Sequence, residues 1–327
     1  MKKKLLVVAV ASLMAMPLAA NAAAKHKMYG AVNLSADKLN ESGAMISSDG
    51  KHGSKLGMKG VMDTNIVDFK VVYQIEAGMY VGSASGLVKE RDSWAGLSSK
   101  SMGTIRLGTI STHYKQTGKM TDVLFGTSAA GRGFLGPQSG LHGGTGAGQG
   151  RATQTMRYDS PSISGAKVIA HYQLTEKENN LGLGLQYKAG SYLAFFDYID
   201  VKSSLDANSN VSESNKTAMK FGGKAKFGPA SLSVQYEIDD DGLSQTTTEG
   251  DDGGGDQLHV QGTYGFGATT FILTVGRNDE NIGFAVAASQ KVAKKASVYV
   301  GYAANGSDVS TDNTSALTLG MAVAFGK

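Results

Sequence analysis

The sequence predicts an all-β fold, a transmembrane antiparallel β-barrel of about 16 strands, on three observations. Segments of alternating apolar and polar residues recur along the 327-residue chain, very short turns and long Gly-rich connections alternate between them, and an export signal precedes them. In the last segment every odd position from Leu317 to Phe325 is apolar, and the even positions are Thr, Gly or Ala. Side chains on a strand point alternately to opposite faces, so each segment has one apolar face. A large soluble β-protein is the alternative, because its strands would alternate in the same way around a core.

The N-terminal segment has the three parts of a signal peptide. Residues 2–4 are lysines, residues 5–19 are apolar, and residues 20–22 are Ala-Asn-Ala, the small-x-small pattern that signal peptidase cleaves. We therefore expect residues 1–22 to be removed and residues 23–327 to form the barrel domain. The apolar run is short for a transmembrane helix, which needs about 20 residues, and we expect no helical membrane anchor later in the chain.

Composition narrows the class further. The formal net charge of +4 falls to +1 without the predicted signal peptide, because that segment carries three lysines and no acidic residue. A nearly neutral exported protein is not expected to bind nucleic acid through its charge. The chain has no cysteine, which excludes disulfides and thiolate metal sites, and its 44 glycines against 4 prolines favour turns and close backbone packing.

The alternating segments predict the position of each strand. We expect strands over residues 27–39, 54–63, 68–79, 92–100, 103–111, 153–161, 166–175, 180–188, 191–202, 216–227, 230–239, 256–267, 269–279, 282–292, 296–304 and 315–325. Every second connection is short, and most of the others are long and polar, including 40–53, 112–152, 202–215, 239–255 and 304–314. Outer-membrane barrels have short periplasmic turns and longer outer loops, so we expect the short connections on the periplasmic side.

Each predicted strand has an apolar row that suits lipid. Examples are Val71, Tyr73 and Ile75, then Leu181, Leu183, Leu185 and Tyr187, then Tyr192, Ala194, Phe196 and Tyr198, then Leu232, Val234 and Tyr236, and finally Phe271, Leu273 and Val275. Many of these rows end in Tyr or Phe, as the aromatic girdles at membrane interfaces do. The chain has no linker or composition break, so we expect one closed barrel.

The sequence gives little support for a catalytic site, a metal site or a cofactor site. Ser111, His113 and Asp122 lie close in sequence and could suggest a catalytic triad. The Gly-x-Ser-x-Gly elbow is absent, so we expect no enzymatic activity. The histidines at positions 26, 52, 113, 142, 171 and 259 have no metal-ligand spacing, and His171 and His259 fall on the predicted lumen face. The glycine-rich run 143–150 lacks the spacing of nucleotide-binding loops, so we expect no cofactor.

Three motifs follow one another along the chain. They are Met28-Tyr29-Gly30 at the start of the first strand, Arg91-Asp92-Ser93-Trp94-Ala95-Gly96-Leu97 followed by Gly103-Thr104-Ile105-Arg106-Leu107-Gly108, and Arg157-Tyr158-Asp159-Ser160-Pro161 with Gly165. In this order and spacing the chain resembles Gram-negative general diffusion porins over essentially its whole mature length. The resemblance implies a homotrimer of barrels of about 16 strands in the bacterial outer membrane. It also implies that the long third loop folds into the lumen, and that each barrel is a water-filled channel for passive diffusion of small hydrophilic solutes and ions.

Two features depart from the pattern of that family. Such porins usually end on an aromatic residue that the barrel-assembly machinery recognises, whereas here Phe325 is followed by Gly326 and Lys327. Acidic residues are common in the third loop of the family, but between residues 112 and 152 the only one is Asp122. We therefore expect an eyelet with little negative charge.

The connection 112–152 is the segment from which function is argued. It is far longer than an ordinary connection and shows no periodicity, and such loops are either functional or disordered. Its many glycines would allow it to fold tightly inside a lumen. A flexible surface loop is the alternative.

The residues opposite the apolar rows would line the lumen and set its ion preference. The basic ones are Lys55, Lys59, Lys70, Arg106, Arg157, Lys167, Lys220, Lys224 and Lys226, and the acidic ones are Glu76, Asp197 and Glu237. Lys115, Lys119 and Arg132 of the long connection add positive charge. A basic pore wall concentrates anions, so we expect a weak anion preference. The alternative is that several of these charges lie at the periplasmic rim, where salt screens them over about 8 Å.

Two arginines and one acidic segment complete the candidate sites. Arg106 and Arg157 are expected at the constriction, because their strands flank the long connection. Residues 239–256 are rich in Asp and Glu, and could bind divalent cations together with lipopolysaccharide phosphates, a solvated loop being the alternative. We expect outer-membrane lipid and lipopolysaccharide as surroundings. A channel selective for a particular anion or sugar and a plugged structural or adhesin barrel remain open as alternatives to a general pore.

Overall fold

The computed structural model describes residues 24–40, 43–47, 53–80, 88–131, 138, 140–205, 210–239, 255–278, 281–305 and 315–326. The predicted signal peptide, Arg132, most of the acidic segment 239–256 and Lys327 lie outside the described residues. No helix in the described part of the chain is long and apolar enough to cross a membrane.

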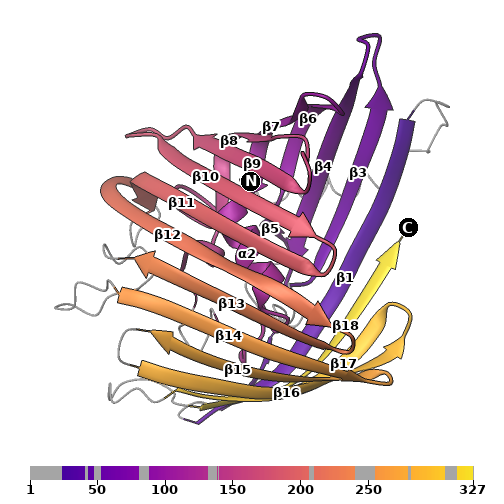
Figure 1. Cartoon of the computed structure of the whole chain (residues 1–327), viewed down its shortest axis with the longest axis vertical. Coiled ribbons are helices and arrows are strands. Elements are labelled where there is room, and N and C mark those ends of the chain that lie inside the picture. Colours follow the sequence, from indigo (N-terminus) through magenta and orange to yellow (C-terminus); the bar gives the residue numbers. More distant parts are fainter. Residues whose placement is uncertain are drawn as a thin grey trace.

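The described strands form one closed antiparallel sheet (Figure 1). They are β1 (Ala24–Leu39), β2 (Ala44–Ser47), β3 (Lys55–Asp63), β4 (Phe69–Met79), β5 (Val88–Glu90), β6 (Ser93–Ser99), β7 (Gly103–Ser111), β8 (Arg151–Asp159), β9 (Ala166–Gln173), β10 (Asn180–Ala189), β11 (Tyr192–Leu205), β12 (Val211–Phe227), β13 (Ala230–Asp239), β14 (Gly255–Phe266), β15 (Thr269–Asn278), β16 (Asn281–Ala293), β17 (Ala296–Asn305) and β18 (Ser315–Gly326). From β6 to β18 each strand pairs with the next one in the chain, and β1 pairs with β18 to close the barrel.

Sixteen strands surround the lumen, as the alternation predicts. Both β2 and β3 pair with β1, and both β5 and β6 pair with β4, so each of these pairs is one interrupted barrel strand. The sequence analysis missed β2 and β5 because each has only three or four residues. It also ended the β11–β12 hairpin several residues too early.

The two ends of the barrel differ as predicted. At one end the strands are joined by short turns, such as the one between β6 and β7. There Gly103 has φ +87, and a Cβ at this position would lie 2.3 Å from the carbonyl oxygen of Asp159. Glycine is required because only it adopts this conformation at so close an approach. The strand ends that flank the long connections lie at the other end.

The two faces of the sheet also follow the alternation. Apolar side chains point outward, and Leu183, Phe271 and Leu273 are 44, 51 and 54% exposed. Their strand neighbours point inward and are mostly polar or small, including Asn33, Thr274 and Thr318. The outward face is thus a continuous apolar surface that water alone would not stabilise.

In the connection between β7 and β8, the described residues lie inside the barrel (Figure 1). This connection contains the helix α2 (His113–Thr121) and the short 3-10 helix η2 (Gly140–His142), which the sequence analysis did not predict. The helix begins at Thr112, whose Oγ1 accepts a hydrogen bond from the backbone of Lys115 at 3.1 Å. α2 contacts strands β10 to β13. Beyond α2, Leu124 and Ala129 pack in an apolar cluster with residues of β15, β16 and β17.

Candidate functional site

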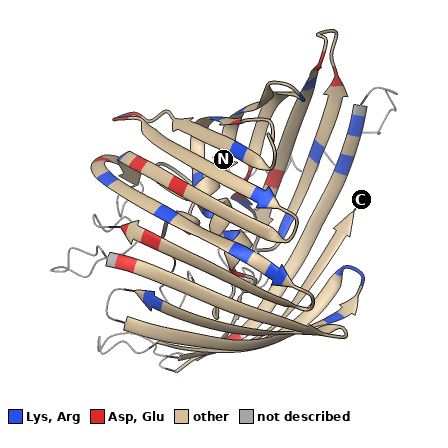
Figure 2. Ribbon diagram, in the orientation of Figure 1, with Lys and Arg blue, Asp and Glu red and all other residues tan. Residues whose placement is uncertain are grey.

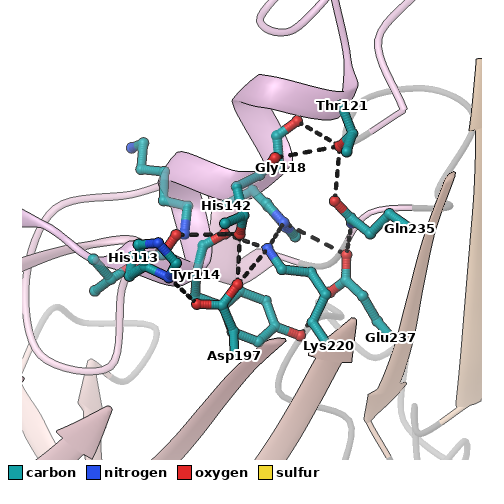
Figure 3. Close-up of polar contacts among 12 residues, drawn as sticks. His113, Tyr114, Gly118, Thr121, His142, Asp197, Lys220, Gln235 and Glu237 are labelled. Carbon is teal, nitrogen blue, oxygen red and sulfur yellow. Dashed lines mark hydrogen bonds and ion pairs between the residues drawn. The ribbon is translucent and has the colours of Figure 1, made fainter. Parts of the chain in front are cut away.

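A buried polar network fixes α2 to the inner face of β11, β12 and β13 (Figure 3). Asp197 of β11 accepts hydrogen bonds from Thr117 Oγ1 at 2.6 Å and contacts His113 Nδ1 at 2.5 Å. Lys220 of β12 lies 3.8 Å from the same carboxylate, and its Nζ donates to the backbone oxygen of Tyr114 and to His142 Nε2, the latter at 2.9 Å. The first turn of α2 is therefore held by a buried ion pair.

Glu237 of β13 anchors the same helix from the other side. Its Oε2 accepts a hydrogen bond from the Tyr114 hydroxyl at 2.9 Å, and its Oε1 lies 3.5 Å from His142 Nε2. Gln235 donates to Glu237 and accepts from Thr121 Oγ1 at 3.0 Å. Burial and the neighbouring carboxylate of Glu237 raise the pKa of Tyr114 well above its ordinary value, so the phenol stays a donor.

This network reduces the number of predicted inner-face charges that are exposed to the solution in the lumen. Lys220, Asp197 and Glu237 fall on the inner face, as predicted, but each is at most 1% exposed. Their charges are satisfied by one another and by α2, so they do not meet the solution in the lumen.

Asp122 and Arg157, both predicted at the constriction, serve as anchors of the connection. Asp122 is fully buried, and its carboxylate accepts hydrogen bonds from the backbone of Leu124 and Gly131 and from Gln261 Nε2, at 2.8 to 3.0 Å. Arg157 is 2% exposed and donates to Ser111 O at 2.6 Å and to Gln116 Oε1 at 2.9 Å. Neither side chain presents its charge to an open lumen.

Arg106 lies opposite Arg157 in the β7–β8 ladder. It forms an ion pair with Asp159, and its guanidinium lies 5.1 Å from the centre of the Trp94 ring. Arg157 Nη2 also bonds Asp159, at 2.7 Å. The two arginines therefore share one carboxylate, which belongs to a residue paired with Thr104 near the short-turn end of β7.

A cavity of about 480 Å³ opens on the long-loop side of α2. Gly53, which precedes β3, and Tyr80, which follows β4, mark its position at that end of the barrel. Its charged lining residues are Lys89, Glu90, Arg91, Lys115, Lys119 and Arg151. Basic side chains thus dominate the charged lining of this cavity.

Both arginines in the lining of this cavity have carboxylate partners. Arg91 Nε lies 2.5 Å from Glu76 Oε1, and Lys55 Nζ approaches the other oxygen of Glu76 at 3.3 Å. Arg151 Nε lies 3.0 Å from Asp92 Oδ2. The predicted lumen residue Glu76 is therefore a bridge between two basic groups rather than a free negative charge.

A second cavity of about 720 Å³ lies on the short-turn side of α2. Its charged lining residues are Lys55, Lys119, Lys291, Lys294 and Lys295, the last three from the end of β16 and the β16–β17 turn. Figure 2 shows the basic residues of this turn and of α2. The opposite wall, from β1, β17 and β18, is lined mainly by alanine, which leaves this side of the lumen open.

Lys119 lines both cavities and therefore stands between them. Its ammonium lies 5.6 Å from the centre of the Phe125 ring. Burial, together with the positive charges of Lys55 and Arg91, lowers the pKa of Lys119 to about 8. Lys119 thus borders both cavities, with a charge that is present at neutral pH.

Two other predicted site residues, Lys59 and Lys70, line neither of the two cavities. Lys59 stands on the inner face of β3, over the ring of Tyr29 at 5.3 Å. Lys70 is exposed at the β3–β4 turn and pairs with Asp63, so it belongs to the short-turn rim. Arg132 lies outside the described residues.

Sequence reasoning missed six Lys and Arg residues that line the cavities, and Lys89, in the short strand β5 that was not predicted, is one of them. Arg91 and Arg151 lie at the boundaries of predicted strands, and Lys291, Lys294 and Lys295 lie at or in a turn, so the alternation assigned them no lumen position. The signal that could have found the turn residues is the density of basic residues in the sequence Lys-Val-Ala-Lys-Lys.

The three residues of the possible triad are not brought together. Ser111 Oγ donates to Asp92 at 2.9 Å, His113 contacts Asp197, and Asp122 binds backbone amides of its own loop. Among the residues that the structure describes, no group of His, Asp and Glu could hold a metal ion. His171 and His259 are on the inner face but buried, so they do not contact the lumen solution.

The sequence matches a family model described as Gram-negative porin over residues 9–310. The chain belongs to the Gram-negative porin family. This porin is therefore a channel of the bacterial outer membrane through which small hydrophilic solutes and ions diffuse passively, and it is not an enzyme. In such barrels the short turns face the periplasm, so the larger cavity is the periplasmic one.

Solved porin structures share the fold of this porin. The anion-selective porin from Comamonas acidovorans superposes with a TM-score of 0.71 at 18% identity, covering 92% of this chain and 100% of that chain. A loop L8 deletion mutant of OmpT from Vibrio cholerae gives 0.67 at 18% identity, covering 93% and 100%. OmpF of Salmonella typhi, in complex with daunomycin, gives 0.66 at 13% identity, covering 92% and 97%. No curated protein sequence matches this chain.

Proposed function

We propose that this porin is a general diffusion channel that prefers small anions, with Lys119 as the side chain that sets the preference. The observation that carries the proposal is the position of Lys119 between two cavities whose charged linings are almost wholly basic. A narrow passage with low-dielectric walls concentrates ions of the opposite charge. The Comamonas acidovorans neighbour, described as anion-selective, is consistent with this proposal.

The preference should be weak. Arg91 and Arg151 pair with carboxylates, and Lys220 is buried with Asp197, so much of the basic charge on the inner face is balanced locally. Salt screens the remaining charges over about 8 Å at physiological ionic strength. A wide aqueous lumen with a few uncompensated lysines favours anions without excluding cations.

We also infer that three copies assemble and that lipid covers the outward apolar rows. A structure of OmpT from Vibrio cholerae described as a trimer form, at 16% identity and a TM-score of 0.62, supports this assembly. Outer-membrane lipid and lipopolysaccharide would surround the trimer, because exposed apolar rows such as Leu181 to Leu185 need an apolar solvent.

The test of the preference is the reversal potential of single channels in a planar bilayer under a tenfold KCl gradient. We expect a potential on the chloride side. Replacing Lys119 with Gln should lower the chloride-to-potassium permeability ratio by up to about tenfold, since one charge about 6 Å from an ion in water contributes about 0.7 kcal/mol, which favours chloride and disfavours potassium. The matched control is Lys100→Gln, because Lys100 is exposed in the β6–β7 turn.

Two results would contradict the proposal. A potential on the potassium side would show that the acidic groups dominate the passage. A chloride-side potential that is unchanged in Lys119→Gln would place the selective charges elsewhere. Saturable flux with block by one particular sugar or anion at the constriction would instead indicate a substrate-selective channel.

A further inference from the structure

We propose that the periplasmic cavity is a binding site for a small anion that carries several negative charges. We call this cavity the lysine vestibule; it is lined by Lys55, Lys119, Lys291, Lys294 and Lys295. The inference rests on the proposed anion channel and adds to it a binding step on one side of the constriction. Singly charged anions would pass through, whereas polyanions would dwell in the vestibule.

The vestibule collects positive charge from three separate parts of the chain. Lys55 comes from β3, Lys119 from α2, and the other three from the end of β16 and the β16–β17 turn. No acidic residue is among the described residues that line it. The carboxylate of Glu76 lies behind Lys55 at 3.3 Å, and Lys295 Nζ donates to the neutral backbone oxygen of Gly326. The vestibule therefore carries an excess of positive charge, and among the described residues Glu76 supplies the carboxylate paired with one of its lysines.

The outer cavity, which lies on the long-loop side of α2, has a smaller excess of positive charge than the vestibule. Glu90 is part of its lining, and Arg91 and Arg151 each lie within 3.0 Å of a carboxylate oxygen. Both cavities share Lys119, so the difference between them comes from the residues on either side. The stronger attraction for a polyanion is consequently on the periplasmic side.

The shape of the vestibule leaves room for such a ligand. Ala31, Ala293, Ala296, Ala322 and Ala324 form much of the lining, and a volume of about 720 Å³ remains between them and the lysines. Larger side chains at these positions would fill that space. Pockets of this size hold small organic or inorganic ligands.

The chemistry of lysine defines the ligand by charge rather than by shape. An ammonium is a compact charge on a flexible stem, unlike the planar fork of arginine, so several lysines can converge on oxyanions of different geometry. A single contact of this kind is weak in water, and only an anion that meets several lysines at once gains appreciable affinity. Linked phosphates and polycarboxylates share this property.

The experiment is single-channel recording with tripolyphosphate added to one side of the bilayer. Because the chain has no cysteine, Ser191→Cys in the exposed β10–β11 turn can be blocked with a bulky impermeant thiol reagent to report which side is periplasmic. We expect brief current blockades that are more frequent from the periplasmic side, where the ligand reaches the vestibule without crossing Lys119.

The deciding variant is Lys291→Gln/Lys294→Gln, with Lys100→Gln/Lys188→Gln as the control on other short turns. The first pair should weaken the block about tenfold, whereas the control should not, because only the first removes two of the charges that the ligand contacts. Lys119 is intact in both, so the chloride-side reversal potential should persist. Citrate should block as tripolyphosphate does if charge alone is recognised, and only tripolyphosphate should block if phosphate is preferred.

The outcomes separate this inference from the proposed function. Equal block from both sides, or block unchanged in Lys291→Gln/Lys294→Gln, would overturn the vestibule while leaving the anion preference intact. A potassium-side reversal potential in the same channels would overturn the anion preference itself.

Discussion

Lys119 and Lys220 show how far burial decides what a lysine does in this lumen. Both lie inside the barrel, and counting residues on the inner face treats them alike. Lys220 is fully buried beside Asp197 and bonded to the backbone of Tyr114, so its charge holds the helix. Lys119 borders both cavities, so its charge acts on the solution. The lumen charge of a porin is therefore a property of exposure and not of composition alone.

The lowered pKa of Lys119 predicts a selectivity that changes with pH. Below a pKa of about 8 the side chain is charged, and above it the charge is lost. An exposed lysine titrates near 10.4, so the anion preference should decline between roughly pH 7 and roughly pH 9, at lower pH than an ordinary lysine would cause. Reversal potentials measured across this range provide the check.

The control for this titration is Lys119→Gln. In this variant the step, which is the decline of the anion preference between roughly pH 7 and roughly pH 9, should be absent, while any change at higher pH should remain. Persistence of the same step in that variant would assign it to another group. Selectivity that stays constant up to about pH 10 would show that Lys119 titrates as an ordinary exposed lysine.

At the scale of elements, α2 depends on the barrel wall more than on its own sequence. It has nine residues, among them a glycine and two threonines, and a helix so short is marginal in isolation. Its partners are polar groups on β11, β12 and β13, such as Glu237, which lies 123 residues away in sequence from Tyr114. The alternation predicted the strands well because it is local, and it could not predict α2 because the contacts that stabilise this helix are distant.

Replacing Lys220 with Met should therefore release α2 without opening the barrel. The substitution leaves Asp197 and Glu237 buried without their ammonium partner, and breaking such a pair costs about 3 to 5 kcal/mol. Amide hydrogen exchange over residues 113–121 should accelerate by about a hundredfold or more, while the strands stay protected.

Lys226→Met is the matched control, since Lys226 is exposed on the same strand. Exchange in α2 should be unchanged in this variant. If Lys220→Met left the exchange of α2 unaltered, the buried ion pair would not be what holds the helix.

At the scale of the whole molecule, the barrel exists because its first and last strands pair. β1 and β18 are paired from Tyr29 opposite Gly326 to Leu39 opposite Ala316, which removes both sheet edges. Sixteen strands, the short-turn end and the apolar outer face could all be predicted, since each follows from a local period of two residues. The path of the pore could not be predicted in this way, because it depends on which inner side chains α2 covers. Removal of residues 1–22 stays a prediction.

The closure makes a prediction for the residue that follows the last aromatic. Gly326 has φ +85, and a Cβ there would lie 2.3 Å from the backbone oxygen of Met28 on β1. A residue other than glycine pays about 1 to 2 kcal/mol for this conformation alone. Gly326→Ala should therefore lower the urea concentration at which the refolded barrel unfolds, measured by the loss of its β-sheet circular dichroism.

Gly262→Ala on β14 is the control, because a Cβ at that position would meet nothing within 4 Å and the backbone has no positive φ. Its unfolding midpoint should stay close to that of the unaltered chain. An equal effect of both variants would mean that glycine content in general, and not the seam, limits stability. A larger loss in Gly326→Ala alone would show that the residue after Phe325 belongs to the closing strand, where it accepts the hydrogen bond from Lys295 Nζ. The chain end beyond the terminal aromatic would then be part of the barrel seam.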